Sequence, residues 1–96
     1  IFVEILKETS LRVAPINRFE AEEMISEIRG SDIFKGLRGE KPLDTEALVE
    51  GLLRLSQLVT DFPEIEGIDI NPVKVLEKGA VALDARILLN KPAHSV

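Results

Sequence analysis

The chain has 96 residues, enough for one small domain, and a net charge of −5 from 17 acidic and 12 basic residues. It has no cysteine, which excludes disulfides and thiolate metal sites, and its acidic balance with only four aromatic residues argues against a nucleic-acid-binding surface. Because no apolar run reaches about 18 residues, the sequence predicts no membrane-spanning segment. We therefore expect a single cytoplasmic domain over residues 1–96.

The first thirty residues predict a strand pair followed by a helix. Residues 1–7 and 11–14 are mostly apolar and flank a short polar turn. Asn17 then offers an N-cap side chain, and Glu20, three residues later, completes a capping box. Gly30 is expected to end the helix. The buried stripe of this helix is expected to consist of Ala21, Met24, Ile25 and Ile28.

A polar segment over residues 31–42 follows this helix. It contains Lys35, Arg38 and Lys41 together with two glycines, so backbone N–H groups and a guanidinium could approach one phosphate there. The alternative, which we favour, is an exposed turn, because neither a nucleotide fingerprint nor a helix N-terminus directly follows the arginine.

Asp44 is expected to cap a second helix that ends before Pro63. Its apolar face is wide, which indicates packing on more than one side. The residues of this face are Leu48, Val49, Leu52, Leu53, Leu55, Leu58 and Val59.

The last third of the chain predicts a β-hairpin. Residues 67–76 and 80–88 flank a Glu-Lys-Gly turn, and glycine marks the reversal. With a two-residue loop at Lys78-Gly79, or a four-residue loop around it, parity assigns the side chains to two faces. The polar face is expected to carry Asp69, Asn71, Val73, Asp84 and Arg86. The core face is expected to carry Ile68, Ile70, Val81, Leu83, Ala85 and Ile87.

Three residues of the polar face, Asp69, Asn71 and Asp84, form a candidate cation site. Asp and Asn are depleted in strands, so their clustering indicates a role beyond solubility. Carboxylate and amide oxygens suit Mg²⁺, and a diagonal separation of about 7 to 8 Å across two strands leaves room for an ion. The alternative is a solvated face. Arg86 could hold a phosphate or pair with Asp84 or Asp69, and we favour the ion pair.

The sequence resembles the end of the ATP-grasp domain in NDP-forming acyl-CoA synthetases, above all the ADP-forming acetyl-CoA synthetases. The resemblance covers nearly the whole chain. Its most specific segments are Asp61-Phe62-Pro63-Glu64-Ile65, Ile68-Asp69-Ile70-Asn71-Pro72 and Ala82-Leu83-Asp84-Ala85-Arg86; residues 1–7, 12–15 and 35–39 also match.

The resemblance implies a fold and a site. The fold would be α+β, a small antiparallel sheet covered by two helices, forming the C-terminal part of an ATP-grasp domain. Asn71 and Asp84 would bind the Mg²⁺ that accompanies ATP or ADP, with Asp69 as a supporting group. Glu4 and Arg38 are candidate nucleotide contacts, and for each the alternative is a residue that simply faces water.

The resemblance also implies an activity, the interconversion of acyl-CoA, ADP and phosphate with free acid, CoA and ATP. A companion CoA-binding subunit or domain would carry a phosphohistidine, so we expect a hetero-oligomer. The family's adenine contacts precede this segment, so the isolated chain is expected to be inactive and to bind MgATP weakly. Two alternatives remain: a non-catalytic ATP-grasp-like domain of a regulatory or acetyltransferase fusion protein, and a protein interaction module.

Overall fold

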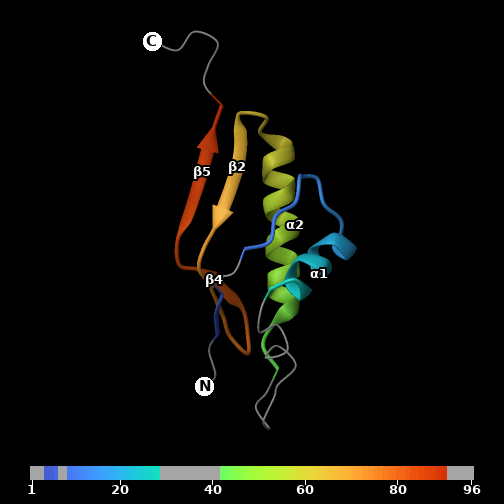
Figure 1. Ribbon diagram of the computed structural model, residues 1–96, viewed down its shortest axis with the longest axis vertical. Helices are drawn as coiled ribbons and strands as arrows, with labels where there is room; N and C mark the ends of the chain where they lie inside the picture. Colours follow the sequence, from blue (N-terminus) through green and yellow to red (C-terminus); the bar gives the residue numbers. More distant parts are fainter. Residues whose placement is uncertain (1–3, 7–8, 29–41, 91–96) are drawn as a thin grey trace.

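The computed structural model describes residues 4–6, 9–28 and 42–90. Within these residues the chain forms two helices and five strands, which are β1 (Glu4–Leu6), α1 (Arg18–Ser26), α2 (Thr45–Asp61), β2 (Ile65–Ile70), β3 (Val73–Val75), β4 (Ala80–Ala82) and β5 (Ala85–Leu89). The long helix α2 runs alongside β2, and α1 packs against α2 (Figure 1). Among the described residues, no helix combines the length and apolarity that crossing a membrane requires.

The capping box predicted for α1 is confirmed. The Asn17 side chain accepts a hydrogen bond from the Glu20 N–H at 2.8 Å, and the Glu20 carboxylate accepts one from the Asn17 N–H at 3.2 Å. The helix ends at Ser26 with Glu27 as its C-cap. Gly30, expected to end the helix, lies outside the described residues. At the start of α1, two backbone N–H groups without a partner inside the helix are thus satisfied by side chains three residues away.

The boundaries predicted for α2 are also confirmed, with Asp44 as N-cap and the last helical residue two positions before Pro63. The Asp44 carboxylate accepts hydrogen bonds from the N–H of Ala47 at 3.0 Å and from the N–H of Gly79 at 2.7 Å. These two donors, Gly79 foremost, lower the pKa of Asp44 because they stabilise its charged form. The same residue therefore caps α2 and fastens the turn between β3 and β4 to it.

The strand pair predicted for the N-terminal residues is wrong. Residues 11–14 form no strand, and β1 pairs instead with β3 in antiparallel register, with Ile5 opposite Lys74. The segment after β1 is held by other bonds, among them one from the Ile16 N–H to the Ser56 hydroxyl of α2 at 2.8 Å. Val13 is 88% exposed, so its apolar character does not reflect a buried strand.

The predicted C-terminal hairpin is present, but as two short ladders in series, β2 with β5 and β3 with β4. The turn is closed by a hydrogen bond from the Leu76 N–H to the Gly79 carbonyl at 3.0 Å, and Gly79 has a φ of 90°, which favours glycine. The structure pairs Ala80 with Val75, whereas a two-residue loop at Lys78-Gly79 would pair Ala80 with Glu77, so the register differs by two residues. Parity is kept, and Asn71 lies directly opposite Asp84 rather than diagonal to it.

The two ladders are out of phase, which corrects part of the predicted face assignment. Ile68 and Ile70 of β2 turn toward the helices, and so do Val73 and Val75 of β3. Two residues, Asn71 and Pro72, therefore separate the last inward side chain of β2 from the first of β3, where regular alternation would leave one. Pro72 lies in that junction and has no N–H to donate to a ladder, which explains the interruption. Val73 consequently packs on the core side, whereas Val81 faces away and is 49% exposed.

The core lies between the two helices and β3. Leu83 and Ile87, expected to be buried, are 51% and 50% exposed. Leu83 precedes β5 and Ile87 lies in it; β5 pairs with β2 on the side away from α2, and neither of the two described helices lies over it (Figure 1). The fully or nearly buried apolar residues are Ala21, Ile25, Leu43, Leu48, Val49 and Val75.

Candidate cation site on the helix-free face

Asn71 and Asp84 lie at the junction of the two ladders. The Asn71 N–H donates to the Asp84 carbonyl at 3.1 Å, and the Leu83 N–H donates to the Pro72 carbonyl at 3.0 Å. Residues directly opposite each other on antiparallel strands project their side chains to the same side. The Asp84 carboxylate accepts a single hydrogen bond from the described residues, from the Ala85 N–H at 2.9 Å. Its second oxygen has no hydrogen-bond partner among the described residues.

Asp69 and Arg86 lie opposite each other two residues further along the strands, beyond the Ile70–Ala85 pair, and so form the next pair on the same face. Both side chains are exposed, and they alternate with Ile68 and Ile70, which turn toward α2. The ion pair expected for Arg86 is absent, because neither Asp69 nor Asp84 places a carboxylate oxygen within 4.0 Å of its guanidinium nitrogens; the ion pairs among the described residues involve other arginines.

The remaining candidate residues are placed only in part. Glu4 lies in β1 with its backbone opposite Val75, but its side chain lies outside the described part of the structure. Arg38 and the glycine-containing segment around it also lie outside the described residues. Within residues 4–6, 9–28 and 42–90, no three His, Cys, Asp or Glu side chains form a group that could hold a metal. A cation at Asn71 and Asp84 would therefore also need water or ligand oxygens, as Mg²⁺ usually does.

An apolar cavity of about 380 Å³ lies on the opposite side of the sheet, between the strands and the two helices. Met24 of α1 and Leu52 and Leu55 of α2 line its wall, and Asp69 is the one charged residue bordering it among the described residues. Apolar walls offer neither metal ligands nor phosphate contacts. The candidate cation ligands therefore lie outside this cavity, on the face of the sheets turned away from the two described helices, which carries Asp69, Asn71, Asp84 and Arg86 and is called the helix-free face.

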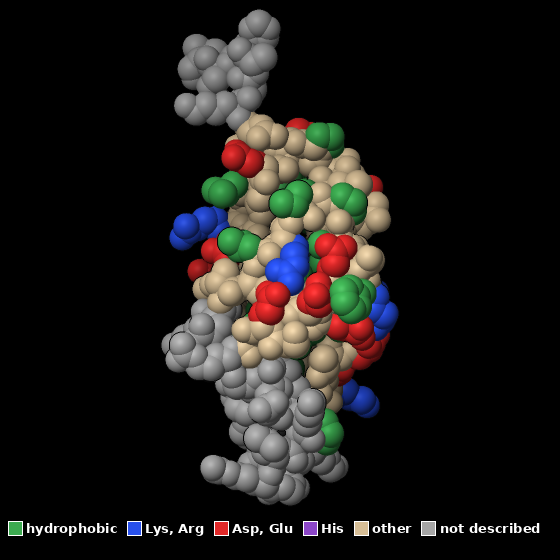
Figure 2. Space-filling view, turned by 45° about the vertical axis from the view of Figure 1, so that its right-hand side comes forward, with side chains coloured by type: hydrophobic (Ala, Val, Ile, Leu, Met, Phe, Trp, Pro, Cys, Tyr) green, Lys and Arg blue, Asp and Glu red, His purple; other side chains and the backbone are tan. Residues whose placement is uncertain are grey.

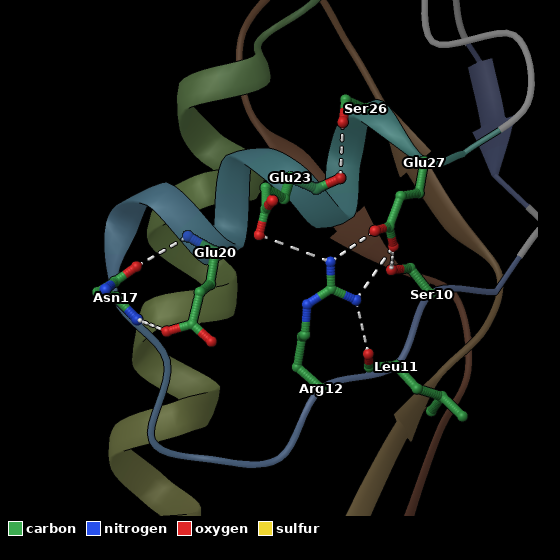
Figure 3. A network of polar contacts seen from close by, with 8 residues as sticks. All are labelled: Ser10, Leu11, Arg12, Asn17, Glu20, Glu23, Ser26 and Glu27. Atoms are coloured by element: carbon green, nitrogen blue, oxygen red, sulfur yellow. Dashed lines mark hydrogen bonds and ion pairs between the residues drawn. The ribbon is translucent and has the colours of Figure 1, made fainter.

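A polar network that the sequence did not reveal fastens the segment before α1 to the end of that helix (Figure 3). Arg12 binds Glu27 through both carboxylate oxygens at 2.6 and 3.1 Å, and the Ser10 hydroxyl donates to the same carboxylate at 2.6 Å. Hydrogen bonds from Arg12, and then Ser10, lower the pKa of Glu27 to about 2. Glu23 lies 3.9 Å from the guanidinium. Both terminal nitrogens of the Arg12 guanidinium thus have partners.

Figure 2 brings α1 and α2 forward and shows acidic side chains gathered around a basic one. Such surface ion pairs stabilise a fold only modestly and offer no free ligand atoms. No sequence pattern indicates this network, because Arg12 and Glu27 are 15 residues apart and such a separation does not predict a contact.

Residues 1–89 match the family model of an ATP-grasp domain. The chain belongs to the ATP-grasp family. This confirms the resemblance inferred from the sequence, together with the α+β class and the antiparallel sheets accompanied by two helices. The position of the segment within a complete ATP-grasp domain, and its extent as one domain, stay predictions.

Individual proteins show the same relationship. The chain is 51% identical over 89 residues to the acetate–CoA ligase [ADP-forming] I subunit beta of Pyrococcus furiosus, covering 93% of this chain and 38% of that protein. It is 48% identical over 91 residues to the acetate–CoA ligase [ADP-forming] I of Archaeoglobus fulgidus, covering 95% of this chain and 13% of that protein. The ATP-grasp chain therefore spans well under half the length of these relatives.

A solved structure has the same fold. It is the dinucleotide-forming acetyl-coenzyme A synthetase 1 of Ca. Korarchaeum cryptofilum in complex with coenzyme A and Mg-AMPPCP, with a TM-score of 0.71 and 39% identity. The match covers 82% of this ATP-grasp chain and 37% of that one.

Proposed function

We propose that this chain is the magnesium-nucleotide-binding part of an ADP-forming acyl-CoA synthetase. Such an enzyme interconverts acyl-CoA, ADP and phosphate with free acid, CoA and ATP. The observation that carries the proposal is the opposition of Asn71 and Asp84 on the helix-free face of an ATP-grasp fold. The names of the relatives, acetate–CoA ligases that form ADP, support this choice of reaction.

The donor set fits a hard divalent cation. Asn71 offers a neutral amide oxygen, and Asp84 offers a carboxylate oxygen without a hydrogen-bond partner among the described residues. Both side chains are exposed, which leaves room for the waters that Mg²⁺ keeps. When bound, the cation supplies charge neutralisation at the phosphate oxygens. Asn71 and Asp84 hold it as ligands, not as acid or base, and Asp69 supports them from the next residue pair on the same face.

The proposal includes a companion subunit or domain that binds CoA and carries a phosphohistidine. Relatives named as beta subunits support a division of the enzyme between chains, and hence a hetero-oligomer. The acid substrate is proposed only as a carboxylic acid that forms a CoA thioester, with acetate as the first compound to test.

The test is an assay of the full-length protein together with its CoA-binding partner. ATP formation should require acetyl-CoA, ADP, phosphate and Mg²⁺, and omission of any one should abolish it. In the reverse direction, acetate, CoA and ATP should release ADP and phosphate. An intact complex that binds no nucleotide would instead support a non-catalytic ATP-grasp-like domain, and a complex that releases AMP and pyrophosphate would contradict the proposed reaction.

A further inference from the structure

Two basic side chains flank the Asn71–Asp84 pair, one on each side along the strands. Arg86 lies two residues beyond Asp84 on β5, and Lys74 lies three residues beyond Asn71 on β3. At about 3.3 Å per residue, their backbones are about 7 and 10 Å from the pair. Both side chains are long enough to reach back toward its centre.

Both basic residues belong to the helix-free face. Lys74 stands between Val73 and Val75, which pack into the core, and it lies opposite the exposed Val81. Arg86 lies opposite Asp69, between residues that pair with Ile68 and Ile70. Because one cavity is lined from β2, β3, β4 and both helices, the inward faces of the two ladders are on the same side of the molecule. Their outward faces therefore also share one side.

Neither basic group is used in an ion pair among the described residues. On the helix side, Arg12 is bound by Glu27, and Arg18 is bound by Glu46 and Glu50. Arg86 makes no such pair, although an aspartate lies directly opposite it. Its guanidinium donors therefore stay available to an anion, next to the oxygens proposed to hold a cation.

We propose that Arg86 and Lys74 contact the phosphate oxygens of the nucleotide whose cation Asn71 and Asp84 bind. This inference rests on the proposed function and adds two residues to its site. A nucleoside polyphosphate is a chain of anions, so a cation at its middle and a basic group toward each end match its charge. Arg86 can donate two parallel hydrogen bonds to one phosphate, whereas Lys74 acts as a point charge.

The test is calorimetric binding of ADP to the full-length protein in its complex, once in excess Mg²⁺ and once in EDTA. Arg86→Gln should weaken ADP binding about tenfold or more in both conditions, because a phosphate contact does not depend on the metal. Lys74→Gln should also weaken it in both, by about threefold or more. The matched controls are Arg54→Gln on α2 and Lys78→Gln in the β3–β4 turn, both exposed, which should bind ADP like the wild type.

Asp84→Asn separates this inference from the proposed function. It should weaken ADP binding in Mg²⁺ but leave it unchanged or tighter in EDTA, where the carboxylate only repels phosphate. If Arg86→Gln or Lys74→Gln binds ADP as its control does, the assignment of that residue is overturned while the cation site stands. If wild type shows no ADP binding, or Asp84→Asn no loss specific to Mg²⁺, the proposed function fails first. Arg86→Lys, which keeps the charge but loses the fork, should fall between wild type and Arg86→Gln.

Discussion

Asp44 accepts a hydrogen bond from the backbone N–H of Gly79 at 2.7 Å, across 35 residues of sequence. Its other carboxylate oxygen caps α2 through the Ala47 N–H. Asp44→Ala should lower the free energy of unfolding by about 1 to 3 kcal/mol, since it removes both the N-cap and the link to the turn. Urea unfolding of the full-length protein as wild type and as Asp44→Ala would measure this loss of free energy. The control is Asp44→Asn, which keeps an acceptor for the Ala47 N–H. Equal losses in both variants would show that charge matters more than the cap.

The same carboxylate should make stability depend on pH. Its pKa is lower in the folded protein than its ordinary value of 3.8, so its contribution is complete above that value and is lost as the pH falls through the lower folded pKa. Wild type should therefore lose stability relative to Asp44→Ala as the pH falls below about 4. A difference in unfolding free energy between the two proteins that is the same at pH 7 and at pH 3 would contradict this.

Glu27 should titrate well below an ordinary glutamate. Arg12 and Ser10 hold its pKa at about 2 instead of 4.5, so its contribution to stability is present above pH 4.5 and is lost as the pH falls toward 2. Arg12→Gln should move the titration of Glu27 back toward 4.5, and NMR of the side-chain carboxyl would detect it. A Glu27 pKa that Arg12→Gln leaves unchanged would argue against the Arg12–Glu27 pair.

Val75 and Val81 give a matched test of where the core lies. They occupy the same ladder, but Val75 is 0% exposed and Val81 is 49% exposed. Val75→Ala should cost about 2 kcal/mol of unfolding free energy, and Val81→Ala less than about 1 kcal/mol. Chemical denaturation measures both. Equal costs would mean that the faces of β3 and β4 are assigned wrongly or that another surface covers Val81.

Asp69 is expected to support the cation site without being essential to it. Asp69→Asn should slow the complete reaction about ten- to a hundredfold, as is typical of groups next to metal ligands. The comparison is with Asp61→Asn, an exposed aspartate at the end of α2 that should leave the rate unchanged. A loss at Asp69 as large as that at Asp84 would make Asp69 a ligand in its own right.

The helices could be predicted from the sequence because their signals are local. Asn17, Glu20 and Asp44 each cap a helix through a backbone N–H three residues away, so spacing alone is sufficient. The partner of β1 could not be predicted in this way. It pairs with β3, almost 70 residues further along, and no local pattern distinguishes that partner from the nearby residues 11–14.

The sequence was sufficient to predict that the candidate site residues share one face of the strands, but not which residues lie directly opposite each other. Alternation along the strands placed Asn71 and Asp84 on one face for either of the loops considered, the two-residue or the four-residue one. Their direct opposition depends on the turn at Gly79, and the change of phase depends on Pro72, so Val73 and Val81 were assigned to the wrong faces. The exposure of Leu83 and Ile87 depends on which strand α2 covers, which periodicity does not encode.

The most direct test of the cation site is the Mg²⁺ dependence of ATP formation by the full-length complex carrying Asp84→Asn. The substitution conserves volume at an exposed position, so folding should be preserved. The rate at limiting Mg²⁺ should fall by roughly two to three orders of magnitude, and excess Mg²⁺ should partly restore it, because one anionic ligand of the cation is lost. Wild-type turnover of Asp84→Asn at limiting Mg²⁺ would remove Asp84 from the site and leave the helix-free face as a solvated surface.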